Sequence, residues 1–79
     1  MTVNSKNKKE LITRIKEYRL DNKLSQQQLA DMVGVRRETI IRLERGEYNP
    51  SLELAYDISK VFGKSIEEIF SFIWRDDKL

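Results

Sequence analysis

Hydrophobic and polar positions recur with a helical period along most of this chain. Apolar residues stand three or four positions apart in five separate stretches, a spacing that gathers them on one side of an α-helix. The first helix is predicted over about residues 10–22, with Leu11, Ile15 and Tyr18 on its inner face. A strand pattern competes only at residues 70–74, where alternating burial also fits a short extended segment. The pattern therefore predicts an all-α fold of five short helices.

Capping residues mark where the later helices begin and end. In a capping box, a serine and a residue three positions later bond each other's backbone amides, and this spacing occurs at Ser25–Gln28 and Ser65–Glu68. A fourth helix is predicted from the capping residue Ser51 to about Phe62. A glycine, which easily adopts the left-handed conformation that ends many helices, follows three of the helices at positions 34, 46 and 63.

Two charged residues fall on faces that are otherwise apolar. Arg19 shares the inner face of the first helix, and Glu44 shares that of a helix over about residues 36–45. Because a lone charge inside a core is very costly, each needs an opposite charge beside it. We predict that Arg19 and Glu44 form a structural ion pair that ties the two helices together.

The helix over residues 36–45 has a predominantly basic outer face. That face presents Arg37, Glu38, Ile41, Arg42 and Arg45. A short helix with a tight glycine-containing turn precedes it, and two helices joined in this way, the second with a basic outer face, form a helix-turn-helix. The pattern therefore predicts a protein that binds double-stranded DNA in a sequence-specific manner.

Composition narrows the functional classes further. The 79 residues fit one domain and include no cysteine and no histidine. Disulfides, thiol catalysis and zinc sites are excluded, and with no glycine-rich phosphate loop an enzyme is the least expected class. We predict no cofactor, no metal and no small-molecule ligand.

Charge and hydropathy bear on partners and location. The net charge of +2 divides into +4 over residues 1–25, zero over 26–50 and −2 over 51–79, which suits an anionic partner on one side. No apolar run approaches the ~18 residues of a membrane span, and the N-terminus lacks the apolar stretch of a signal peptide. A cytoplasmic protein without membrane contact is expected.

Between residues 11 and 70 the chain resembles the Cro/C1-type (XRE-like) helix-turn-helix of phage repressors and bacterial regulators. The matching positions are Ser25-Gln26, Leu29-Ala30, Gly34-Val35, Thr39-Ile40, Leu43-Glu44, Gly46, Asn49-Pro50-Ser51, Ile58, Phe62-Gly63 and Ser65–Phe70. The resemblance implies a five-helix, lambda-repressor-like domain with residues 36–45 in the major groove and the preceding helix across the DNA backbone. It also implies a homodimeric regulator, such as a repressor, on a pseudo-palindromic operator with half-sites about 34–36 Å apart.

The resemblance places base-reading residues at Arg37, Glu38 and Arg42. Arginine can bond guanine O6 and N7 together, and glutamate can accept from cytosine N4. Ile41 faces the same way, either toward a thymine methyl or partly against the preceding helix. The alternative for the charged residues is a solvated face with a Glu38–Arg42 salt bridge. Candidates for contacts to the DNA backbone are Gln26, Arg36, Thr39, Arg45, Tyr48 and Asn49.

The chain is predicted to divide into three parts: residues 1–9, 10–70 and 71–79. The first is a flexible basic arm, either simply disordered or touching DNA, and the second is the DNA-binding domain. The third is an apolar-to-acidic tail, and an exposed aromatic patch there would mark a partner surface. The dimer contacts predicted are Phe70, Phe72, Ile73 and Trp74, with packing inside the domain as the alternative. The main functional alternative is a protein-interaction module, such as an antitoxin or anti-regulator, for which DNA binding is secondary.

Overall fold

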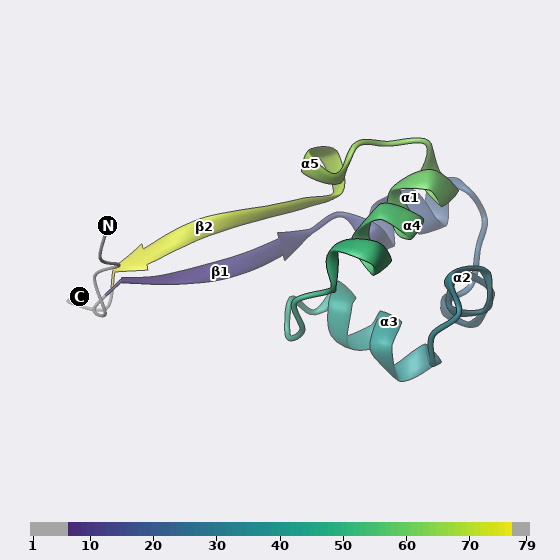
Figure 1. Cartoon of the computed structure of the whole chain (residues 1–79), viewed down its shortest axis with the longest axis horizontal. Helices are drawn as coiled ribbons and strands as arrows, with labels where there is room; N and C mark the ends of the chain where they lie inside the picture. Colours follow the sequence, from purple (N-terminus) through teal and green to yellow (C-terminus); the bar gives the residue numbers. More distant parts are fainter. Residues whose placement is uncertain (1–6, 77–79) are drawn as a thin grey trace.

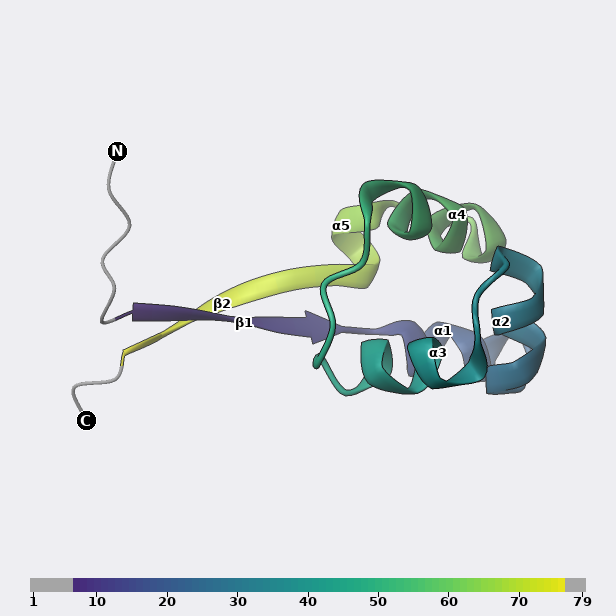
Figure 2. The same cartoon turned by 60° about the horizontal axis from the view of Figure 1, so that its bottom comes forward.

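The computed structural model describes residues 7–76, and the side chains of residues 9–74. Its elements, in chain order, are β1 (Asn7–Thr13), α1 (Ile15–Asp21), α2 (Gln26–Val33), α3 (Arg37–Glu44), α4 (Leu52–Phe62), α5 (Ile66–Ile69) and β2 (Phe70–Asp76). The helices gather into a globular domain, and the two strands leave it together as a twisted ribbon (Figures 1 and 2). The ribbon gives the molecule its elongated extents of 40 × 21 × 20 Å.

The two strands show that the all-α prediction is wrong. β1 pairs antiparallel with β2, with Leu11 opposite Phe72 and Thr13 opposite Phe70, and the first helix begins only at Ile15. The helix was predicted to begin too early because of Leu11. This residue stands four positions before Ile15, so it fits the inner face of a helix as well as the inward side of a strand. Its partner strand lies about 60 residues away in sequence, beyond the reach of a local period.

The strand assignment also shortens the predicted basic arm. Residues 7–9 belong to β1, and residues 1–6 lie outside the described residues.

The capping residues set the ends of the helices as predicted. The hydroxyl of Ser25 accepts from the backbone N–H of Gln28 at 3.0 Å, and the Gln28 side chain accepts from the N–H of Ser25 at 2.8 Å. The same reciprocal pair joins Ser65 and Glu68 at the start of α5. Bonding to the Ser65 amide lowers the pKa of the Glu68 carboxyl, because the bond favours its charged form.

One apolar core holds the helices and the base of the ribbon together. Its buried members are Leu11, Ile15, Tyr18, Leu29, Ala30, Ile40, Leu43, Leu54, Ala55, Ile58, Phe62, Ile69 and Phe70. Phe70, a candidate for the dimer contact, is therefore a core residue, with 9% of its surface exposed. None of the helices in the described part of the chain is long and apolar enough to cross a membrane.

The loop after α3 lies directly against β1. Gly46 has a φ of +71°, and a Cβ atom added there would stand 2.5 Å from the carbonyl oxygen of Leu11. Only glycine permits both this left-handed conformation and this close approach. The contact fixes the end of α3 relative to the ribbon.

Candidate nucleic-acid interface

The α2–α3 unit is anchored by the inner face of α3. Ile40 and Leu43 have no exposed surface, and the half-buried Val33 and Val35 pack against the same core. Gly34, with a φ of +74°, ends α2 and lets the chain turn into α3 within two residues. Because Ile40 and Leu43 pack into the core, the opposite flank of α3 faces solvent.

The outer flank of α3 is exposed and basic. Arg36, Arg37, Glu38, Arg42 and Arg45 are all exposed. Within the described side chains, none of these four arginines forms an ion pair, so the alternative Glu38–Arg42 salt bridge is absent. The Arg42 guanidinium lies instead over the ring of Tyr48, 5.5 Å from its centroid. The flank therefore offers positive groups to an outside anion.

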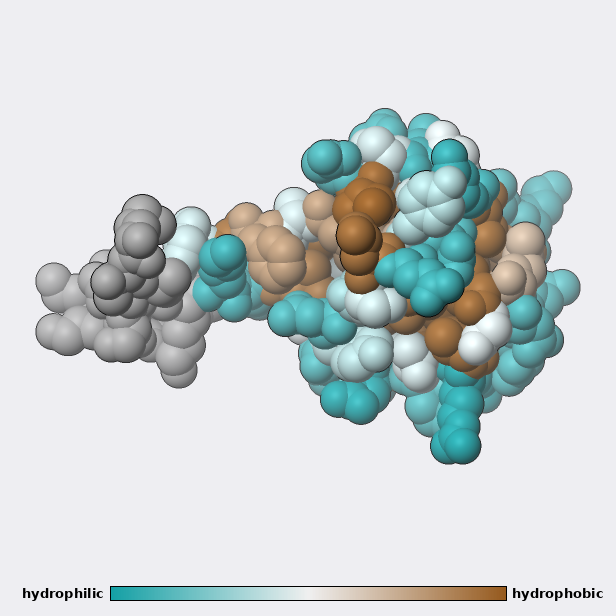
Figure 3. Space-filling view, in the orientation of Figure 1, coloured by the Kyte–Doolittle hydropathy of each residue, from teal (hydrophilic) through white to brown (hydrophobic). Residues whose placement is uncertain are grey.

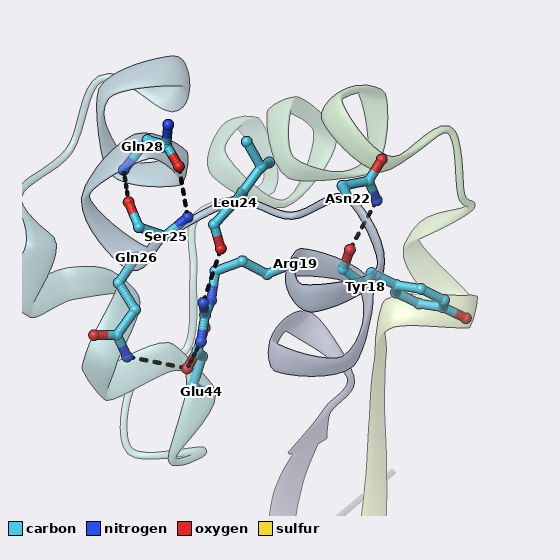
Figure 4. A network of polar contacts seen from close by, with 8 residues as sticks. All are labelled: Tyr18, Arg19, Asn22, Leu24, Ser25, Gln26, Gln28 and Glu44. Carbon is cyan, nitrogen blue, oxygen red and sulfur yellow. Dashed lines mark hydrogen bonds and ion pairs between the residues drawn. The ribbon is translucent and has the colours of Figure 1, made fainter.

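Behind this flank, a buried network joins three helices (Figure 4). Arg19 Nε donates to Glu44 Oε2 at 2.6 Å, and the Arg19 Nη1 group donates to the backbone carbonyl of Leu24 at 2.9 Å. The pair is enclosed, with 9% and 7% of the two side chains exposed. Glu44 Oε1 also accepts from the side-chain amide of Gln26 at 3.1 Å. Thus the predicted pair of Arg19 and Glu44 forms, and it also positions Gln26 at the start of α2.

A groove beside this network adds a residue that the sequence did not single out. It has a volume of about 650 Å³ and is lined by Lys16, Arg19, Ser25, Gln26, Gln27, Arg37 and Glu44. Lys16 reaches it from α1, because a residue three positions before Arg19 shares its side of the helix. That spacing was visible in the sequence. Of its three cationic side chains, Arg19 is paired with Glu44, and the other two together with the first amides of α2 make the groove attractive to a phosphate.

The remaining predicted contact residues surround the same flank. Ile41 is half-buried and lines a shallow hollow of about 340 Å³ with Lys16, Gln26, Glu44 and Arg45. Thr39 is also half-buried, whereas Tyr48 and Asn49 are exposed in the loop after α3. Arg36 stands at the start of α3 without a side-chain cap. Phe72, Ile73 and Trp74 are exposed on β2, and Phe72 lines a hollow of about 570 Å³ together with Tyr48 and Asn49.

In α3, an apolar face is buried and an arginine-rich flank is exposed, and a tight turn containing a glycine joins α2 to it. These features define a helix-turn-helix DNA-binding domain. A family model described as Helix-turn-helix matches residues 15–69, and the chain belongs to that family. A protein of Archaeoglobus fulgidus named as an uncharacterized HTH-type transcriptional regulator is 60% identical over 60 residues, spanning 76% of this chain and 84% of the relative. The chain is thus an HTH-type transcriptional regulator that binds DNA.

Two further similarities are informative. The CTXphi transcriptional repressor RstR of Vibrio cholerae is 30% identical over 59 residues, which span 75% of this chain and 53% of RstR. Among solved structures, the restriction-modification controller protein C.AhdI from Aeromonas hydrophila has a TM-score of 0.64 and 31% identity, covering 70% of this chain and 83% of that one.

Proposed function

We propose that this regulator is a repressor that inserts α3 into the major groove of a specific operator. The observation that carries the proposal is the outer flank of α3, where four arginines are exposed and make no ion pair among the described side chains. Unpaired guanidiniums on a rigid helix suit both phosphates and guanine edges. The similarity to RstR, which is named a repressor, supports repression over activation.

Within this proposal, Arg37, Glu38 and Arg42 read base edges. Arg37 and Glu38 occupy the first turn of α3, the end of a recognition helix that meets the bases. Glu38 accepts from a cytosine amino group and repels phosphates, so it sacrifices non-specific affinity for selectivity. Ile41, half-buried beside them, keeps enough exposed surface to contact a thymine methyl group.

The backbone contacts come from both sides of the groove. Gln26 holds one phosphate at the start of α2, where its amide is oriented by Glu44 and where Lys16 adds charge. The remaining backbone contacts position the protein without specifying sequence; they are Arg36, Thr39, Arg45, Tyr48 and Asn49.

The operator is a pseudo-palindrome read by a homodimer in the cytoplasm. A two-fold symmetric protein presents two copies of α3, so each half-site is read once and the half-sites are about 34–36 Å apart. We assign the dimer contact to Phe72, Ile73 and Trp74 of β2, whose side chains are 51%, 47% and 57% exposed.

A mobility-shift assay over a range of salt concentrations tests the proposal. The probe is duplex DNA from upstream of the gene that encodes this protein. Each neutralised phosphate contributes about −0.9 to the slope of log affinity against log salt concentration. The affinity of a protein that binds through several arginines therefore falls steeply as the salt concentration rises. A shift that is insensitive to salt, or the absence of any shift at low salt, contradicts DNA binding by this flank.

A further inference from the structure

The outer edge of β2 is an unpaired strand edge on an exposed ribbon. Within the described chain, β2 has one neighbouring strand, β1, and residues 71–76 make no backbone hydrogen bond outside that ladder. The ribbon projects from the helical domain, and apolar side chains continue along it (Figure 3). A two-stranded ribbon is marginally stable by itself, and an open edge is a template for another strand.

The hydrogen bond after the strands shows which backbone groups face outward. Arg14 N–H donates to the carbonyl of Ile69 at 2.8 Å, one step beyond the Thr13–Phe70 pair. Opposed pairs in an antiparallel ladder alternate between bonded and non-bonded. Leu11–Phe72 and Lys9–Trp74 are therefore non-bonded pairs. The N–H and C=O groups of Phe72 and Trp74 consequently point away from β1, toward the open edge.

Gly46 provides independent support and distinguishes the two edges. The Leu11 carbonyl oxygen lies 2.5 Å, and its carbon 3.6 Å, from the position of a Gly46 Cβ, so the carbonyl points at Gly46 and not at β2. This is the orientation expected for a non-bonded pair. The loop after α3 thus covers the outer edge of β1 at Leu11. Along the outer edge of β2, by contrast, no described backbone group bonds to residues 71–76, so this edge is open to a further strand.

The side chains beside this edge are apolar on both faces. Phe72 and Trp74 share one face, where the Lys9 ammonium lies 5.6 and 5.2 Å from their ring centroids, and Ile73 lies on the other. Phe72, Ile73 and Trp74 are each about half exposed. Such a strand gains most from a partner that is apolar at the same positions.

We propose that the outer edge of β2 pairs antiparallel with β2 of a second copy, with the two-fold axis at Ile73. This pairing rests on the proposed homodimer and gives a four-stranded sheet in the order β1, β2, β2 of the second copy, β1 of the second copy. Phe72 then exchanges backbone bonds with the second copy's Trp74, and their rings meet on one face. The strand fits itself in this register, because each aromatic residue opposes the other and Ile73 opposes its own copy.

The register agrees with the spacing of an operator. In it, the second copy's Phe70 lies six residues along the sheet from Phe70, which is about 20 Å at roughly 3.4 Å per residue. The helical domains extend outward from these two points, and each is about as wide as the shorter molecular extents of 21 and 20 Å. Their centres are then roughly 40 Å apart, near the 34–36 Å between half-sites.

Introduced cysteines test the register directly, because the chain contains none. In the proposed sheet, Ile73 and its copy form a non-bonded pair with Cα atoms about 4.5 Å apart, within the range that a disulfide bridges. The full-length Ile73→Cys variant, oxidised at micromolar concentration, should become a covalent dimer that still binds operator DNA. We expect at least about tenfold more cross-linked product than from the control variants Ile12→Cys and Ser71→Cys.

Both controls are exposed positions on the same face of the ribbon as Ile73, but the register keeps them away from their own copies. Sedimentation of the native chain separates two failures. A native dimer in which Ile73→Cys cross-links no better than the controls, or in which Trp74→Cys cross-links instead, overturns pairing about Ile73 and leaves the homodimer standing. A native chain that is monomeric with and without operator DNA overturns the homodimer itself.

Discussion

Arg37 and Gln26 lie within one groove, yet we expect them to contribute differently to binding. Arg37 is exposed at the start of α3, whereas Gln26 is half-buried and bonded to Glu44. Arg37→Ala should weaken operator binding by about 1–3 kcal/mol and leave random duplex less affected, because a base contact is lost. Fluorescence anisotropy with both duplexes measures the difference.

Two matched variants serve as controls for this measurement. Lys60→Ala removes an exposed cation from α4, away from the interface, and should change neither affinity. Gln26→Ala should weaken both duplexes alike, since a phosphate contact does not depend on sequence. An equal loss on both duplexes from Arg37→Ala would reassign that residue to the DNA backbone.

Glu44 supports both stability and the interface. Glu44→Ala leaves the enclosed Arg19 guanidinium without its counter-charge, and breaking a buried pair in this way costs about 3–5 kcal/mol. Urea unfolding followed by circular dichroism should show this loss. The double variant Arg19→Met with Glu44→Leu should recover most of it, because an apolar pair needs no charge partner. If Glu44→Ala is as stable as the native chain, the pair is not a structural one.

At the scale of elements, two glycine variants can be compared to test the contact between β1 and the loop after α3. Gly46 and Gly34 both have positive φ, but only at Gly46 would a Cβ meet another atom, the Leu11 carbonyl oxygen. Gly34→Ala should cost about 1–2 kcal/mol, from the left-handed backbone alone. Gly46→Ala should cost at least about 1 kcal/mol more, since β1 or the loop must move.

Thermal unfolding of the two glycine variants provides the comparison. Equal losses of stability in the two variants would show that the loop after α3 can move away from β1 at little cost. The outer edge of β1 would then be open as well.

The helices could be predicted from the sequence because their signals are local. Ser25 with Gln28, Ser65 with Glu68 and the glycines after α2 and α4 all act within a few residues, and each marks a boundary in the structure. Of the strands, β1 was not predicted, and β2 was predicted only as the alternative for residues 70–74. Their pairing joins residues near both ends of the described chain, and Leu11 fits either element. For Phe70, the sequence left a dimer contact and packing inside the domain as alternatives, and the structure buries the residue in the core.

The interface was predictable to the extent that it follows from helix periodicity. The spacing along α3 separates Ile40 and Leu43 from the arginines, and the structure keeps that division. The bond from Gln26 to Glu44 and the approach of Lys16 to the groove depend on how α1, α2 and α3 pack together, which no single helix determines.

At the scale of the whole molecule, the helical domain and the ribbon have separate tasks. The domain leaves the α3 flank exposed, and β2 pairs with β1 instead of folding across that flank (Figure 1). Pairing two such molecules through their ribbons would present two recognition helices with the same facing along one two-fold axis. Affinity for an operator should therefore depend on both half-sites being present.

Selection of bound duplexes from a random pool, with the native chain and with Arg37→Ala in parallel, tests most directly whether the α3 flank reads bases. The native chain should enrich a two-fold symmetric site, and Arg37→Ala should enrich the same site with one base pair relaxed in each half. A native pool that stays random, or an Arg37→Ala site identical to the native one at every position, would contradict base reading by this flank.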